Sequence, residues 1–146
     1  MGLSTVRFNF RGVGKSQGQY DQGIGETNDL LAILQWLKDV CPEQSIWLAG
    51  FSFGAYVASH AAAALRPARL VLIGPASANF TVAAVAADTL VVHGEADEVV
   101  PLSATLDWAR PQALPVVVVP GGGHFFLGQL PLLKSLVVRH LSAPAG

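Results

Sequence analysis

The sequence predicts an α/β fold, with a mostly parallel sheet and helices on both of its faces. Three short apolar segments, residues 69–73, 89–93 and 115–120, lack the polar alternation of a half-exposed strand. Segments of helical composition, or with an apolar residue at every third or fourth position, lie between and around them. Strands that are apolar on both faces and alternate with helices are typical of parallel sheets covered on both sides.

The length of 146 residues limits the protein to one domain, and its charged fraction is small. We place a single domain over residues 1–146, in which 51% of the residues are hydrophobic and 13% are charged. Soluble domains usually carry about 25% charged residues. The chain therefore either buries much of its surface or keeps an apolar face for a partner. Its net charge of −1 predicts no binding to nucleic acid or to an anionic membrane.

Cysteine use and hydropathy predict a cytoplasmic protein. The one cysteine, Cys41, excludes an internal disulfide, which fits a reducing compartment. No apolar run is long enough to span a bilayer. The first residues also lack the basic and then apolar layout of a secretory signal.

The predicted elements follow one another regularly. Residues 4–10 alternate and are rich in β-branched and aromatic side chains, which predicts a strand. After a glycine-rich loop, an apolar stripe predicts a helix over residues 26–41. Glu26 and Asp29 are expected to cap this helix or to pair with Arg11. The remaining predictions are strands at 45–49, 69–73, 89–93 and 115–120, helices at 55–65, 102–109 and 131–141, and an alanine-rich connection at 76–88.

A serine lies between two glycines where a predicted strand meets a predicted helix. The pentapeptide around Ser52, GFSFG, matches G-x-S-x-G. In this motif, small neighbours allow a sharp turn that lifts the serine hydroxyl above the sheet as a nucleophile. The same five letters also occur by chance in loops. The strand before them and the helix rich in small residues after them favour the nucleophile.

Two later loops carry the other groups that nucleophilic serine catalysis requires, a base and an acid that orients it. Asp97 and His124 each follow a predicted strand. Because parallel strands end at one edge of the sheet, the order Ser52, Asp97, His124 brings the three together. Glu95 and Glu98 remain alternatives for the acid. His124 follows three glycines, so we expect it in a mobile, exposed loop.

The loop after residue 93 also allows a metal site. His93, Glu95 and Asp97 alternate as ligands on a strand do, but the bend after His93 disfavours that geometry. We therefore predict no metal and no cofactor, and expect His93 to pack in the core or anchor a loop. Four aromatic residues beside the candidate nucleophile and base either line an acyl pocket or belong to the core: Phe51, Phe53, Phe125 and Phe126.

Taken together, the motifs resemble the α/β-hydrolase superfamily, in particular small bacterial serine hydrolases without a cap, similar to dienelactone-hydrolase-like proteins. The matching pieces are RFNFRGVGKS, GIGETNDLLAILQWL, GFSFGA, HGEADEVVP and GGGHFF. The resemblance implies that Ser52 is the nucleophile, Asp97 the orienting acid and His124 the general base. It also implies that the N–H of Phe53 forms part of the oxyanion hole.

The sequence departs from the pattern of this family in one respect. Its members carry two or three strands before the segment with which this sequence begins, and a loop after the third supplies a second oxyanion N–H. We expect both to be missing, which leaves a gap beside the strand before Ser52 and unpaired backbone groups there. Either residues 4–10 close onto that strand, or a second copy fills the gap in a homo-oligomer, or the chain is a fragment.

The predicted function is that of a carboxylesterase-like serine hydrolase. It cleaves an ester or related acyl bond of a small soluble substrate through an acyl-enzyme, with no cofactor. The lack of a cap insertion predicts an open site and a preference for short acyl chains. Because one oxyanion element is missing, the alternative is a weakly active or inactive hydrolase-like domain that acts by assembly or binding.

Overall fold

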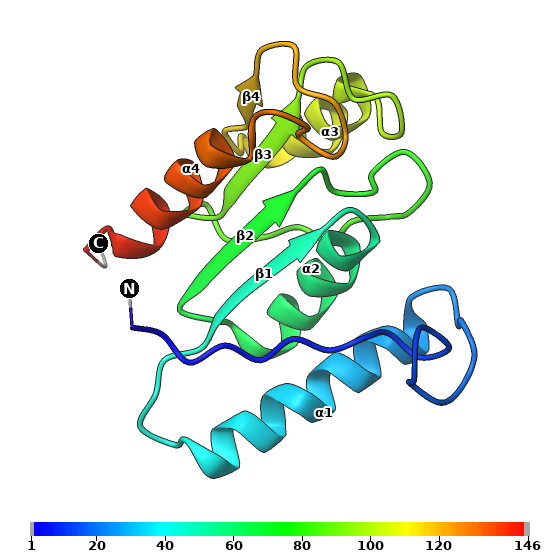
Figure 1. Ribbon diagram of the computed structural model, residues 1–146, viewed down its shortest axis with the longest axis vertical. Coiled ribbons are helices and arrows are strands. Elements are labelled where there is room, and N and C mark those ends of the chain that lie inside the picture. The colour runs from blue at the N-terminus through cyan, green and yellow to red at the C-terminus, as the bar shows by residue number, and fades with distance from the viewer. Residues whose placement is uncertain (1, 145–146) are drawn as a thin grey trace.

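A parallel sheet forms the centre of the structure. The computed structural model describes residues 2–144. Its strands lie side by side in chain order: β1 (Trp47–Phe51), β2 (Arg69–Ile73), β3 (Leu90–Gly94) and β4 (Val117–Val119). All neighbours pair in parallel, with Phe51 opposite Ile73 and Ile73 opposite Val92. The carboxyl ends of the strands therefore meet at one edge of the sheet (Figure 1).

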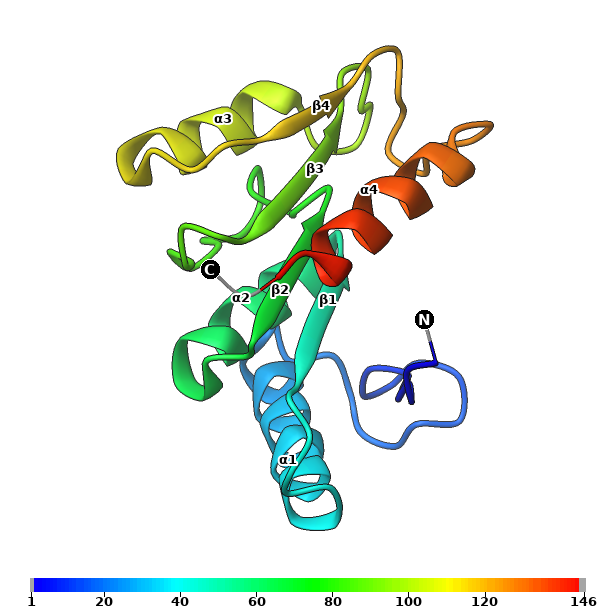
Figure 2. The ribbon, with the colours of Figure 1, turned by 90° about the vertical axis from the view of Figure 1, so that its left-hand side faces the viewer.

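Helices cover both faces of this sheet. They are α1 (Ile24–Val40), α2 (Phe53–Leu65), α3 (Leu102–Ala109), the short 3₁₀ helix η1 (Arg110–Gln112) and α4 (Leu130–Ser142). Helices α2 and α3 lie on one face and α4 on the other, and α1 packs against α2 (Figure 2). The prediction of a mostly parallel sheet with helices on both faces is confirmed. No helix within residues 2–144 combines the length and hydropathy needed to cross a membrane.

The core lies between the central strands and α2. Val71, Leu72 and Val91 are almost completely buried, which agrees with their uniformly apolar segments. Helix α2 contributes the buried Ala55 and Ala61, and such small side chains let its backbone lie close to β1 and β2. Apart from the segment 4–10, the predicted strands and helices are present, with shifts of a few residues at their ends.

Helix α1 begins earlier than predicted because Glu26 supplies acceptors for the turn before it. The carboxylate of Glu26 is completely buried and accepts hydrogen bonds from the N–H groups of Asp21 at 2.7 Å and Gly23 at 2.9 Å. Arg11 donates two hydrogen bonds of 2.7 Å to Asp29. The expected capping and pairing roles of these acidic residues are confirmed.

The strand predicted over residues 4–10 is wrong. The segment is extended, but it forms no ladder with any strand in the described part of the chain, and residues 2–9 are exposed. In Figures 1 and 2 it runs outside the sheet, so β1 is an edge strand. A strand pairs with a neighbouring strand about 4.8 Å away, and residues 4–10 have no such neighbour in the described part of the chain. Only Phe10 is partly buried, with its ring 5.2 Å from that of Phe53.

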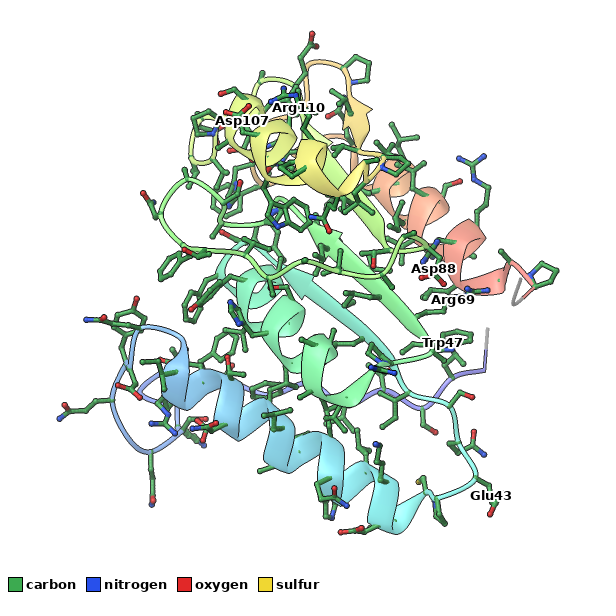
Figure 3. The ribbon with its side chains drawn as sticks, turned by 180° about the vertical axis from the view of Figure 1, so that it is seen from behind. Glu43, Trp47, Arg69, Asp88, Asp107 and Arg110 are labelled. Atoms are coloured by element: carbon green, nitrogen blue, oxygen red, sulfur yellow. The ribbon has the colours of Figure 1, made fainter. Side chains whose placement is uncertain are left out.

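Arg69 fastens the start of β2 to the end of α4. Its guanidinium donates hydrogen bonds of 2.9 Å to the carbonyl oxygens of Ala143 and Pro144. It also lies 3.3 Å from the carboxylate of Asp88 (Figure 3). Because α4 contains no fully buried residue, these contacts help to hold it against the sheet.

Replacing Glu26 by alanine is expected to lower the free energy of unfolding by about 1–3 kcal/mol for each N–H that loses its acceptor in a buried site. Denaturant titration followed by circular dichroism measures the change. Asp39→Ala is the matched control, since the Asp39 carboxylate is exposed and bonded only to Gln35, and a change within about 0.5 kcal/mol is expected there. Equal losses in the two variants would contradict the capping role.

Candidate active site

Ser52 occupies a strained turn between β1 and α2. Its backbone angles are φ 53° and ψ −118°, a combination that residues with a side chain rarely adopt. The turn also brings position 50 against the carbonyl of Gly54, where a β-carbon would collide with it. Gly50 is therefore required by this close approach, which explains the first glycine of the G-x-S-x-G motif.

The structure brings the three predicted residues together. The Nε2 atom of His124 lies 3.0 Å from the Oγ atom of Ser52, and its Nδ1 atom lies 2.7 Å from the Oδ2 atom of Asp97. The exposed fraction is 2% for His124 and 8% for Asp97. An imidazole placed between a hydroxyl and a carboxylate in this order can accept the serine proton while the acid fixes its tautomer.

The carboxylate of Asp97 is buried but well supplied with donors. Its Oδ1 atom accepts hydrogen bonds from the N–H groups of Val99 at 2.9 Å and Val100 at 2.7 Å, while Oδ2 faces His124. Burial alone would raise the pKa of Asp97. The hydrogen bonds from His124, Val100 and Val99 outweigh burial and hold this pKa below its usual value. The acid is therefore ionised at neutral pH.

The expectation that His124 is exposed is wrong, because the imidazole is buried and the acid loop binds the backbone around it. Glu95 accepts a hydrogen bond of 2.8 Å from the N–H of Gly121, and Glu98 accepts one of 3.3 Å from the N–H of His124. The two alternative acids thus bind the backbone of the base loop, and neither faces the imidazole. Two backbone hydrogen bonds join the same loops, from Glu95 to Val119 at 3.0 Å and from Ala96 to Gly122 at 2.9 Å.

His93 and Glu95 do not meet Asp97 in the way a metal site requires. Glu95 turns to Gly121, whereas His93 is completely buried and its Nε2 atom lies 2.8 Å from the carbonyl oxygen of Val100. Within residues 2–144, no three histidine, cysteine or acidic side chains form a group that could hold a metal ion. His93 therefore anchors the loop that carries the acid, one of the two roles predicted for it.

Gly74 is a site residue that sequence reasoning missed. It follows β2 with φ +50°, and a β-carbon there would lie 3.5 Å from the Cε1 atom of His124 and 3.7 Å from the Oδ2 atom of Asp97. The positive φ makes any side chain strained at this position. The sequence signal that could have indicated this role is a glycine directly after an apolar strand, but the same pattern occurs at ordinary strand ends.

Aromatic rings border the base. The rings of Phe51 and Phe125 lie 4.9 Å and 5.1 Å from the imidazole of His124, and both phenylalanines are exposed. Phe126 is buried in the core instead, in contact with Val92 and Val119. Of the four aromatic residues considered from sequence, Phe51 and Phe125 therefore face the open side of the site.

Comparison with known proteins gives consistent results. The model of the alpha/beta hydrolase fold family matches residues 2–89. An alpha-beta serine hydrolase homologue from Coxiella burnetii is 43% identical, with a TM-score of 0.79 over 93% of this chain and 68% of that one. A serine hydrolase without a lid from Xanthomonas campestris is 42% identical, with a TM-score of 0.83 over 94% of this chain and 67% of that one.

Curated relatives are longer than this chain. An uncharacterised protein from Mycobacterium tuberculosis is 33% identical over 85% of this chain and 54% of its own length. The chain thus spans about half of that relative, and its match to another curated relative covers 24% of that protein. Since the family model matches more than half of the chain and the structural neighbours share the same sheet and helices, the protein belongs to the α/β-hydrolase fold family.

Proposed function

We propose that the protein is a serine hydrolase that cleaves an ester or related acyl bond of a small substrate. The observation that carries the proposal is the continuous series of hydrogen bonds from Ser52 through His124 to Asp97, at 3.0 Å and 2.7 Å. Family membership supports it, as does the description of two relatives as serine hydrolases.

In the proposed reaction, the Oγ atom of Ser52 attacks the acyl carbonyl carbon while its proton passes to the Nε2 atom of His124. The tetrahedral intermediate collapses when His124 returns that proton to the leaving alcohol, which leaves an acyl-enzyme. Water then attacks the acyl carbon with His124 as base, and Ser52 is regenerated. Asp97 stabilises the imidazolium in both halves and remains ionised.

One group is available for the oxyanion. Phe53 is the first residue of α2. Its N–H therefore has no partner within the helix and lies at the positive end of the helix dipole. We assign this N–H to the oxyanion of the intermediate. Loss of one oxyanion donor costs about 10²–10³ in rate in known enzymes. The described residues therefore support a slow esterase.

The surroundings favour a small and accessible substrate. The connection from β2 to β3 contains no helix or strand, so it forms no folded cap over the site. The exposed rings of Phe51 and Phe125 border the entrance with apolar surface. Short, uncharged acyl groups fit such a site, and p-nitrophenyl acetate is a suitable probe.

A second candidate function is favoured by the free edge of β1. The β1 strand pairs on one side with β2, while its other side carries no strand in the described part of the chain. Unpaired strand edges are common sites of association. A hydrolase-like domain that works by assembly or binding would keep this edge and would show no reactive serine.

Replacing Ser52 by alanine is expected to abolish covalent labelling by a fluorophosphonate probe. It should also lower p-nitrophenyl acetate hydrolysis by at least about 10³-fold, because the nucleophile is lost. Ser45→Ala, at an exposed serine ahead of β1, is the control and should label like the wild type. A folded wild-type protein that does not label at Ser52 would favour the assembly function.

The pKa of Asp97 predicts how stability changes with pH. Because its folded pKa lies below its usual value of 3.8, the carboxylate stabilises the fold at pH values above about 4. This stabilisation is lost as the pH falls through the lower, folded pKa. Asp97→Asn has no such titration, so its free energy of unfolding should fall less than that of the wild type between about pH 6 and pH 3. Parallel pH profiles of the two proteins, from denaturant titration, would contradict the lowered pKa.

A further inference from the structure

His93 is a completely buried, ionisable residue that the proposed reaction does not use. It lies in β3, four residues before Asp97. Its Nε2 atom is 2.8 Å from the carbonyl oxygen of Val100 and 3.4 Å from the Oδ2 atom of Asp97. The same Oδ2 atom faces the Nδ1 atom of His124 at 2.7 Å. His93 is therefore next to the candidate acid and lies near the same carboxylate oxygen that faces His124.

The contacts fix the tautomer of His93. A carbonyl oxygen can only accept a hydrogen bond, so the Nε2 atom of His93 must carry the hydrogen that Val100 receives. The Nδ1 atom of His93 is buried and has no hydrogen-bond partner among the described residues. His93 therefore acts as a donor through Nε2.

The donor stabilises the short turn that carries the acid. Val100 accepts from His93 through its carbonyl and donates its own N–H to the Oδ1 atom of Asp97. The N–H of Val99 binds the same oxygen. With Oδ1 occupied by this turn, the other carboxylate oxygen remains free to receive the imidazole of His124. The two peptide groups on either side of Val100 thus connect the imidazole of His93 to the carboxylate of Asp97.

Ordinary core packing does not explain a histidine at this position. A leucine would fill a similar volume without burying the unpartnered Nδ1 atom, and an unsatisfied buried polar atom costs about 1–3 kcal/mol. The imidazole provides what leucine lacks, an N–H that donates to the carbonyl of Val100 and lies beside the carboxylate of Asp97.

We propose that His93 is a positioning residue, which holds the carboxylate of Asp97 in the orientation that receives the Nδ1 hydrogen of His124. The inference rests on the proposed serine hydrolase function and extends it by one residue beyond Ser52, His124 and Asp97. His93 touches neither the substrate nor the reacting atoms. It acts through Val100 and Asp97.

Two matched substitutions test the geometry of the donor. The amide nitrogen of glutamine reaches about as far as the Nε2 atom of histidine, whereas that of asparagine ends near the Nδ1 position. His93→Gln should keep kcat for p-nitrophenyl acetate within a few-fold of the wild type. His93→Asn and His93→Leu should lower kcat by about 10-fold to 100-fold, the range expected when a catalytic group is displaced by up to about 1 Å. The KM should stay nearly constant, since His93 does not contact the substrate.

A spectroscopic measurement reports on the same geometry without turnover. The proton shared by His124 and Asp97 should give a strongly deshielded resonance in proton NMR of the free protein, assigned by its absence in His124→Ala. We expect this resonance in the wild type and in His93→Gln, and its loss or upfield shift in His93→Asn. Ser59→Ala is the control for the loss of a buried hydrogen-bonding side chain. The Ser59 hydroxyl donates to the carbonyl of Tyr56 and accepts from the N–H of Ala83, away from the site. This variant should lose stability and keep both the resonance and kcat.

The outcomes separate this inference from the proposed function. Folded Asn and Gln variants with equal kcat and the same resonance would overturn the positioning role of His93. If the wild type neither labels nor turns over ester, yet the resonance still depends on the residue at 93, the positioning role stands and the hydrolase function fails. If His93→Leu does not fold, the Asn and Gln pair still decides the result.

Discussion

The parallel hydrogen-bond ladder, which continues past the ends of the strands, is the constraint on which the site depends. The N–H of Ser52 donates to the carbonyl of Ile73 at 2.9 Å, and the N–H of Gly74 donates to that of Val92 at 2.8 Å. The N–H of Glu95 continues the series to β4. Each strand thus fixes the first residues of the loop that follows its neighbour. The ladder therefore fixes where the loops that carry Ser52 and Asp97 begin, and hydrogen bonds within and between the later loops place the carboxylate and the imidazole.

Much of this arrangement could be predicted from sequence, because the signals are local. Uniformly apolar segments indicate buried parallel strands, and a loop after each strand must lie at the shared edge. That argument needs no knowledge of side-chain geometry, which is why Ser52, His124 and the loop that carries Asp97 could be predicted from order and position. The assignment among Asp97, Glu95 and Glu98 needed the resemblance to a family, because all three carboxylates lie in the same loop.

What could not be predicted depends on partners distant in sequence. Residues 4–10 have a strand-like pattern, but pairing requires a neighbouring edge, and the pattern cannot say whether one is present. Three glycines before His124 suggest mobility, yet two glutamates some 26 residues earlier in the chain bind that loop. The role of Gly74 likewise depends on its contact with the imidazole of His124, which follows β4.

The two halves of the site are supported unequally. On the side of β3 and β4, the acid and base loops are joined by backbone and carboxylate hydrogen bonds, which hold the groups proposed to transfer the proton. On the side of β1, Phe51 is exposed and the strand edge is unpaired in the described structure. In the proposed reaction, the oxyanion forms close to that second side, beside the N–H of Phe53. Since oxyanion stabilisation is usually the largest single contribution to acyl transfer, the proposed activity depends most on the half of the site with fewer contacts.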